Sequence, residues 1–141
     1  MNIVYTSGTF DLFHIGHLNI LRKSKALGEF LVVGVSTDEL VASYKVSEPV
    51  IRYEDRAEII RHIDFVNQVV KQESLFDYFL MQKLGVNKMT IGSDWKDKKN
   101  DNLSHIIEHT DIEVVFLPYT KDVSSTHIKN SIQKGWQVDA S

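Results

Sequence analysis

Short apolar runs alternate along this chain with stretches of helical periodicity, and this alternation limits the fold more than any other feature. The apolar runs predict five strands, at residues 3–6, 30–35, 65–70, 88–91 and 113–117. The other stretches predict helices at residues 16–27, 37–44, 53–62, 75–84, 102–109 and 125–134. Regular alternation of this kind is typical of an open, mostly parallel α/β sheet whose right-handed crossovers place helices on both faces.

Glycine and hydroxyl residues predict where some of these helices begin and end. Gly28 follows the first predicted helix and is expected at its C′ position, which favours glycine. Ser36-Thr37 and Ser124-Ser125 precede predicted helices, and their hydroxyls are good N-cap acceptors.

The composition favours a single globular domain over residues 1–141. Of the 141 residues, 43% are hydrophobic and 25% are charged, and the chain has no repeat or interdomain linker. The lack of cysteine excludes disulfides and thiolate metal sites. The net charge of −3 argues against a general nucleic-acid binder, and no apolar run approaches the ~18 to 20 residues of a membrane span. We therefore expect a cytoplasmic protein with neither a nucleic-acid nor a membrane partner.

Residues 8–17, Gly-Thr-Phe-Asp-Leu-Phe-His-Ile-Gly-His, place two histidines three residues apart where the first predicted strand turns into a helix. The free N–H groups and positive dipole end of a helix attract anions into such a turn. His14 and His17 lie about one helical turn apart, so their imidazoles can aim N–H groups at one point. Because a helix N-terminus disfavours imidazolium, we expect at least one neutral ring that donates a hydrogen bond. The segment predicts a polyphosphate site.

The same segment resembles the HxGH signature of the nucleotidyltransferase superfamily, and is most similar to that of the cytidylyltransferases, particularly those acting on glycerol 3-phosphate. The resemblance covers most of the chain. It implies a Rossmann-like five-stranded parallel sheet of order 3-2-1-4-5, with the site at the carboxyl ends of the strands. It implies that His14 and His17 are catalytic and that Asp11 lies near the acceptor. It assigns nucleotide binding to Gly8, Thr9, Phe10 and Gly16.

A second anion site is predicted before the last helix, where hydroxyl groups meet the free N–H groups of a helix start. Residues 119–126 resemble the family's signature Arg-Thr-Glu-Gly-Ile-Ser-Thr-Thr. The match implies nucleotide or triphosphate contacts from Thr120, Ser124, Ser125 and Thr126. Tyr119, also expected in the nucleotide site, stands where the family usually has arginine. A phenol can stack on a base or donate one hydrogen bond, whereas the lost cation would have to come from Lys121 or Lys129.

Two further segments match the family. Asp94 and Trp95 follow the fourth predicted strand and resemble its Gly-Asp-Asp-Trp segment, so we expect them to help form the nucleotide pocket. Lys45 is the only lysine in the loop at residues 43–48, where the family places a catalytic lysine, often in a pair. A loop lysine can swing over transferring phosphates and neutralise charge as it develops.

The third predicted helix matches the family only in part. Arg56 matches a family arginine that reaches the substrate phosphates and is expected to be catalytic. Eight residues on, where glycerol-3-phosphate enzymes keep a second arginine, the chain has Asp64, which is expected at the acceptor. Arg61, three residues before Asp64, is a candidate to compensate because this spacing keeps it on a similar helix face.

Together the segments predict an enzyme that joins CMP from CTP to a small phosphorylated acceptor and releases pyrophosphate. The acceptor oxygen attacks in line, so positioning and charge stabilisation provide most of the catalysis. Mg²⁺ is expected as a cofactor held by the triphosphate and water rather than by a protein metal site. The first candidate acceptor is glycerol 3-phosphate, used for a cell-surface polymer such as teichoic acid or capsule. The resemblance also implies a homodimer.

Three alternatives stay open. Tyr119, Asp64 and the single Lys45 are departures that suit a nitrogen-containing acceptor, such as phosphocholine, phosphoethanolamine or a phosphorylated amino acid. An adenylyltransferase of the same superfamily would use ATP instead of CTP. A silent nucleotide-binding subunit that drives oligomerisation is the non-enzymatic alternative, and the retained His14, His17, Lys45 and Arg56 argue against it.

Overall fold

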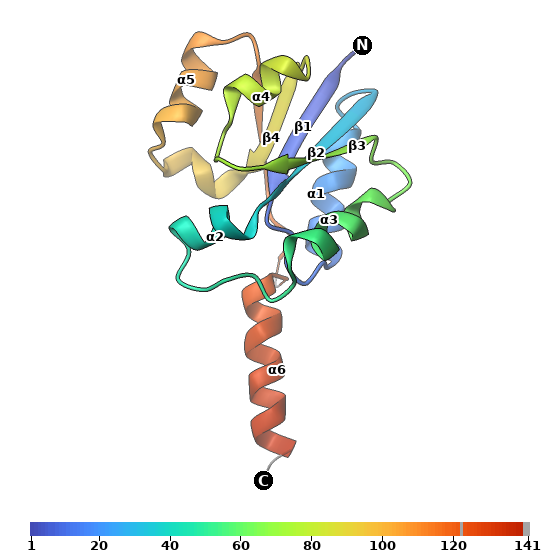
Figure 1. The fold of residues 1–141 in the computed structure, drawn as a ribbon, viewed down its shortest axis with the longest axis vertical. Coiled ribbons are helices and arrows are strands. Elements are labelled where there is room, and N and C mark those ends of the chain that lie inside the picture. Colours follow the sequence, from blue (N-terminus) through green and yellow to red (C-terminus); the bar gives the residue numbers. More distant parts are fainter. Residues whose placement is uncertain (122, 140–141) are drawn as a thin grey trace.

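The computed structural model describes residues 1–121 and 123–139, and its centre is one parallel sheet of order β3-β2-β1-β4-β5 (Figure 1). The strands are β1 (Ile3–Gly8), β2 (Phe30–Ser36), β3 (Gln68–Gln72), β4 (Lys88–Gly92) and β5 (Glu113–Leu117). The predicted sheet and its strand order are confirmed. The strand order reverses between β1 and β4, and open α/β sheets bind ligands beyond the carboxyl ends of strands at such a point.

Helices cover both faces of the sheet (Figure 1). They are α1 (Ile15–Lys25), α2 (Asp38–Tyr44), α3 (Tyr53–Arg61), α4 (Tyr78–Lys83), the 3-10 helix η1 (Ser93–Asp97), α5 (Asp101–His109) and α6 (Ser125–Asp139). One core joins the sheet to Leu21 of α1 and Ile60 of α3. The other core joins it to Met81 of α4 and Ile106 of α5.

Successive residues of the central strands alternate between these two cores. Val4, Leu31 and Val33 are buried in the α1/α3 core. Their neighbours Tyr5 and Val32 are buried in the α4/α5 core. Side chains of a strand point to opposite faces in turn, so a strand covered on both faces needs apolar residues at every position. This explains the nearly continuous apolar run of β2.

Two predicted elements begin three residues later than expected. The third strand begins at Gln68 rather than at residue 65, because Phe65 and Val66 pack against the α1/α3 core before the chain enters the sheet. Helix α4 begins at Tyr78 rather than at residue 75. Asp77 caps it by accepting a hydrogen bond from the Leu80 N–H, and Phe76 has a φ of +54°, which no right-handed helix accommodates.

The helix caps were predicted correctly in two cases and wrongly in one. Thr37 caps α2, and the Ser124 hydroxyl accepts from the backbone N–H of His127 in the first turn of α6. Gly28 is not a C′ residue, because α1 ends at Lys25 with Ala26 as a right-handed C-cap. A Cβ on Gly28 would lie 2.6 Å from the backbone oxygen of Asn2, so glycine is needed there for close approach of the chain to the start of β1.

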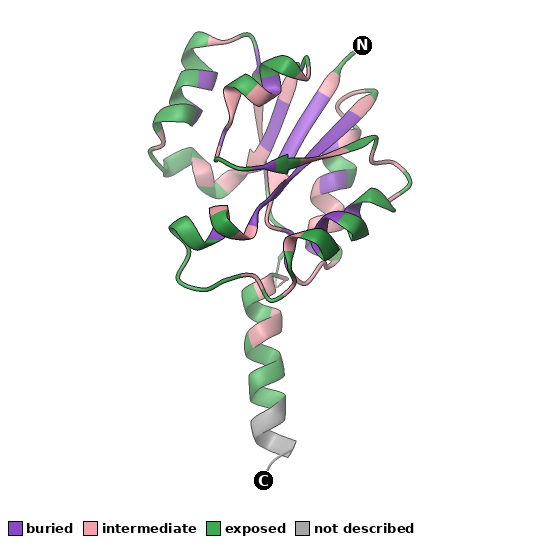
Figure 2. Cartoon of the chain, viewed as in Figure 1, coloured by how far each residue is buried: buried purple, intermediate pink, exposed green. Residues whose placement is uncertain are grey.

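Helix α6 extends away from the sheet, and only its first turns lie near the other elements (Figure 1). Its residues 130–135 are exposed (Figure 2). Within the described part of the chain, no helix combines the length and apolar character needed to cross a bilayer.

Candidate active site

The turn between β1 and α1 builds a helix cap from two histidines. His14 is the N-cap of α1, and its Nδ1 accepts a hydrogen bond from the Gly16 N–H at 3.0 Å. The Nδ1 of His17 accepts in return from the backbone N–H of His14 at 3.3 Å, and the two rings stack with their centroids 3.8 Å apart. A Cβ on Gly16 would lie 2.8 Å from the His14 ring, so glycine is required beside this cap.

These bonds fix the tautomer of both rings. A nitrogen that accepts a backbone N–H carries no proton, so each neutral imidazole holds its proton on Nε2 and offers it as a donor. Within residues 1–121 and 123–139, the buried Nε2 of His14 has no hydrogen-bond partner. Burial lowers the pKa of His14, and burial together with the neighbouring His14 lowers the pKa of His17 to about 4. Both rings are therefore neutral donors at pH 7.

The backbone of the same turn is strained on either side of Asp11. Phe10 has a φ of +56° and Leu12 a φ of +52°, in the left-handed region that costs a residue other than glycine on the order of 1–3 kcal/mol. Asp11 is buried, and its carboxylate accepts hydrogen bonds from the backbone N–H groups of Val50 and Ile51. The strained turn and the loop after α2 are thus held to each other through this carboxylate.

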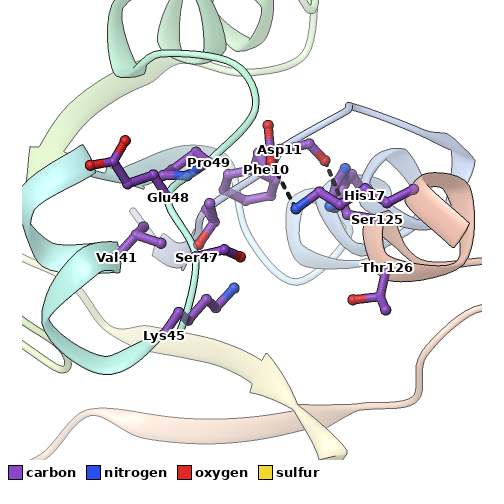
Figure 3. Close-up of a pocket in the computed structure, with 12 residues that line it drawn as sticks. Phe10, Asp11, His17, Val41, Lys45, Ser47, Glu48, Pro49, Ser125 and Thr126 are labelled. Carbon is purple, nitrogen blue, oxygen red and sulfur yellow. Dashed lines mark hydrogen bonds and ion pairs between the residues drawn. The ribbon is translucent and has the colours of Figure 1, made fainter. Parts of the chain in front are cut away.

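A cavity of about 310 Å³ opens beside His17, between the β1–α1 turn, the loop after α2 and α6. We call it the α6 cavity. Lys45, Ser47 and Glu48 lie on one side of it, and His17, Ser125 and Thr126 lie on the other (Figure 3). Its remaining lining residues are Thr9, Phe10, Asp11, Val41, Pro49 and Lys129.

A second cavity of about 460 Å³ lies where β1 and β4 end, and we call it the β4 cavity. Gly8, Thr9 and Lys45 border it on one side, so Thr9 and Lys45 are common to both cavities. Phe76 and Trp95 form part of its apolar wall and contact each other edge to face. An aromatic wall next to the turn at the start of a helix suits a nucleotide.

Tyr119 forms a wall of the β4 cavity together with Asp94. Its hydroxyl donates to Asp94 Oδ1 at 2.7 Å, and the Nζ of Lys98 lies 3.0 Å from the other carboxylate oxygen. Partial burial on its own would raise the pKa of Asp94. The hydrogen bonds from Tyr119 and Lys98 and the charge of Lys98 outweigh this effect, so the pKa of Asp94 is lowered. A Cβ on Gly92 would collide with the Tyr119 hydroxyl, so glycine makes room for the tyrosine.

The segment before α6 joins the other side of the site. The Oγ1 of Thr120 accepts a hydrogen bond from Asn19 of α1 at 3.0 Å, and the Ser125 hydroxyl donates to the backbone oxygen of Asp11. Ser125 and Thr126 line the α6 cavity, whereas Thr120 and Ser124 line neither cavity and hold the segment in place. Asn19 was not anticipated, because an asparagine on the exposed side of a predicted helix carries no signal of its own.

Arg56 does not reach either cavity. Its side chain is fully buried, and its guanidinium donates to the backbone oxygens of Thr9, Ser36 and Ile51 and to Asp38. The direct phosphate contact expected for Arg56 is therefore not seen in this structure. Asp38 was missed in the sequence because an acidic residue in the first turn of a helix ordinarily interacts only with the helix dipole.

The remaining predicted residues lie outside the two cavities. Asp64 is exposed in the turn that leads to the amino end of β3, at the opposite edge of the sheet from the carboxyl ends. Arg61 is also exposed and pairs with Glu58. Of the possible substitutes for the missing family arginines, Lys121 is exposed and lines neither cavity, whereas Lys129 lines the α6 cavity.

A sequence model of the family described as Cytidylyltransferase-like matches residues 5–131, a span that runs from β1 into α6 and includes the linings of both cavities. The chain belongs to this family. As a cytidylyltransferase-like protein it is a nucleotidyltransferase enzyme, which confirms the reaction class predicted from the sequence.

Relatives with assigned names differ in the reaction those names give. The chain is 39% identical to a glycerol-3-phosphate cytidylyltransferase of Bacillus spizizenii, over 94% of this chain and 98% of that protein. It is 36% identical to an FAD synthase of Thermococcus onnurineus, over 82% of this chain and 79% of that protein. A crystal structure of a lipopolysaccharide core biosynthesis protein from Thermoplasma volcanium superposes with a TM-score of 0.68 at 27% identity, covering 86% of this chain and 98% of that one.

Proposed function

We propose that this cytidylyltransferase-like protein transfers CMP from CTP to a small phosphorylated acceptor and releases pyrophosphate. The observation that carries the proposal is the pair of adjoining cavities that share Thr9 and Lys45, with the neutral His17 beside them. Two anionic substrates, one in each cavity, would meet at one lysine. The β4 cavity suits the nucleotide because of its aromatic wall, and the smaller α6 cavity suits the acceptor.

In the proposed reaction an acceptor phosphate oxygen forms a bond to the α-phosphorus of CTP. The bond from that phosphorus to the oxygen bridging to the β-phosphate breaks, and pyrophosphate leaves with its electron pair. The Nε2–H group of His17, which lines the α6 cavity, donates to the charge that develops on the transferring group, and Lys45 neutralises charge between the substrates. His14 lines neither cavity and its Nε2 is buried, so its donor would serve as a second one only where the bound triphosphate reaches the His14 ring. No general base is required, because a phosphate monoester is largely ionised at neutral pH.

We propose that Mg²⁺ enters with CTP, ligated by triphosphate oxygens and water. The described residues include no cluster of three or more histidine, aspartate or glutamate side chains suited to a metal. Asp11 is engaged by backbone N–H groups and Asp94 by Tyr119 and Lys98. This donor set fits an ion carried in by the nucleotide, and the ion would shield the triphosphate charge.

Glycerol 3-phosphate is the first candidate acceptor, supported by the Bacillus relative that the chain matches over almost its full length. A nitrogen-containing phosphorylated acceptor is the second candidate. Its support is the departure of the sequence from the family pattern at Tyr119 and at the single Lys45. Glu48 lines the α6 cavity, but Figure 3 shows its carboxylate directed away from His17. Asp64, the carboxylate expected at the acceptor from the sequence, lines neither cavity.

The discriminating experiment follows pyrophosphate release with CTP or ATP against glycerol 3-phosphate, phosphoethanolamine and phosphocholine. We expect CTP with glycerol 3-phosphate to give the highest kcat/KM. Higher turnover with ATP would assign the chain to the adenylyltransferases, as the FAD synthase relative allows. If the protein binds a nucleotide but releases pyrophosphate with none of these nucleotide and acceptor combinations, it is a silent nucleotide-binding subunit. The His14→Asn/His17→Gln double variant controls for contaminating activity.

We also propose a homodimer. Ile59 on α3 and Phe79 on α4 are 43% and 81% exposed although both are large and apolar, and apolar residues of this kind are often covered by a second copy. Sedimentation at micromolar concentration should show a species of twice the chain mass. Ile59→Glu should dissociate this species if the dimer forms through α3, and Phe79→Glu should do so if it forms through α4. A monomer alone would contradict the proposal.

A further inference from the structure

Two lysines from distant parts of the chain face the α6 cavity. Lys45 comes from the loop after α2, and Lys129 comes from the second turn of α6. Lys129 pairs with Asp11, with 3.5 Å between Nζ and Oδ2. Charge-assisted hydrogen bonds of this type are ordinarily 2.7–2.9 Å long, so this ion pair is loose.

Asp11 does not depend on Lys129 for its hydrogen bonds. Its Oδ2 accepts the N–H of Val50 at 2.8 Å, and its Oδ1 accepts the N–H of Ile51 at 2.9 Å. The carboxylate is almost completely buried, whereas about a third of the Lys129 side chain is exposed. An ammonium group has three donors, and this geometry leaves Lys129 free to direct one of them into the cavity.

The two ammonium groups also act on each other. The pKa of Lys45 is lowered first by burial and next by the charge of Lys129, while Asp11 opposes the shift. Two cations on one small cavity repel each other unless an anion enters between them. Ser125 and Thr126 at the start of α6 border the same space.

We propose that Lys129 binds the phosphate of the acceptor, so that this phosphate lies between Lys129 and Lys45 in the α6 cavity. The inference rests on the proposed function and assigns a residue to its acceptor site. Lys129 then takes over a role that the missing family arginines would otherwise fill, while Asp11 holds the lysine in position before the acceptor arrives. Helix α6 thereby contributes to the choice of acceptor.

The test compares Lys129→Gln with Lys134→Gln, which removes the same charge from an exposed position of α6 that lines neither cavity. Initial rates are measured with glycerol 3-phosphate varied at saturating CTP, and then with CTP varied. Loss of one charged hydrogen bond should raise the KM for glycerol 3-phosphate roughly 10- to 100-fold. The KM for CTP should change less than about twofold. Lys129→Arg should recover part of the loss, and thermal melting checks that each variant is folded.

A titration with inorganic phosphate separates this inference from the proposed function, because it requires no turnover. Calorimetry is run on the wild type, Lys129→Gln and Lys134→Gln, with and without α,β-methylene-CTP. Phosphate binding that weakens only in Lys129→Gln supports the inference even if CTP is not the nucleotide. Equal phosphate binding in all three proteins, or a rise in the KM for CTP in place of that for the acceptor, would overturn it.

Discussion

The guanidinium of Arg56 lies 2.6 Å from Asp38 in a fully buried position, and its other donors bond to backbone oxygens of three separate segments. These segments are the turn after β1, the end of β2 and the loop that precedes α3. The arginine thus joins the backbone around Thr9 to the loop that carries Lys45. We interpret Arg56 as a positioning residue.

Replacing Arg56 with alanine should destabilise the protein by about 3 to 5 kcal/mol, because it leaves the backbone oxygens of Thr9, Ser36 and Ile51 without their donors and empties the space of a fully buried side chain. The Asp38 carboxylate is 39% exposed and can be hydrated instead. Arg56→Lys should recover only part of this loss, since one ammonium cannot reproduce the guanidinium fork. Urea unfolding measures both effects. Near-normal unfolding together with a large rise in the KM of either substrate would instead indicate direct substrate contact.

The sequence predicted the sheet because its signals are local. The apolar runs of β1 and β2 and the hydroxyl cap of α2 depend on spacing within a few residues, and each survives in the structure. The turn between β1 and α1 could be singled out for the same reason, since Gly16 and both histidines lie within one short segment.

Sequence reasoning failed where a role depends on how distant segments assemble. Asp64 was placed at the acceptor by its position in a motif, but the chain carries it to the opposite edge of the sheet. The partners of Arg56 come from three segments that no spacing rule connects. The histidine cap was not anticipated because N-caps are usually serine, threonine, aspartate or asparagine.

The histidine cap leads to a prediction that separates folding from catalysis. His14→Asn keeps a good N-cap acceptor, and His17→Gln keeps a side chain that can complete the capping box, but both remove the Nε2–H donor. Each should lower kcat roughly 100-fold or more while the melting temperature changes little. His14→Ala removes the cap acceptor as well, so it should lower both kcat and the melting temperature. The expected loss of folding stability is about 1 kcal/mol. Full activity in His14→Asn would show that the ring serves only as a cap.

The lowered pKa of His17 predicts a dependence of stability on pH. Its pKa is about 4 in the folded protein and ~6.5 in the unfolded chain, so between these values the unfolded chain binds the extra proton. Stability should therefore fall as the pH is lowered from about 6.5 to 4, by an amount on the order of 3 kcal/mol.

His17→Gln is the matched control for this pH effect, because it lacks the titrating ring. Urea unfolding of both proteins between pH 4 and 7 should give curves that diverge as the pH falls, with the wild type losing more stability. Parallel curves across this range would mean that His17 titrates normally in the folded protein.

The last prediction concerns Tyr119, which replaces the usual family arginine. Because its hydroxyl bonds to Asp94 in the wall of the β4 cavity, we expect this position to affect the nucleotide rather than the acceptor. Tyr119→Arg would supply a cation with several donors and should lower the KM for CTP about tenfold or more, with little change in the KM for glycerol 3-phosphate.

Asp64→Arg introduces the same guanidinium at the opposite edge of the sheet and outside both cavities, so it should leave both KM values unchanged. Tyr119→Phe tests the hydroxyl alone and should weaken CTP binding by only a few fold, since Asp94 keeps Lys98 as a partner. Steady-state kinetics with each substrate varied in turn measures all three variants. A change in acceptor KM for Tyr119→Arg, with CTP KM constant, would place Tyr119 at the acceptor and reverse the assignment of the two cavities.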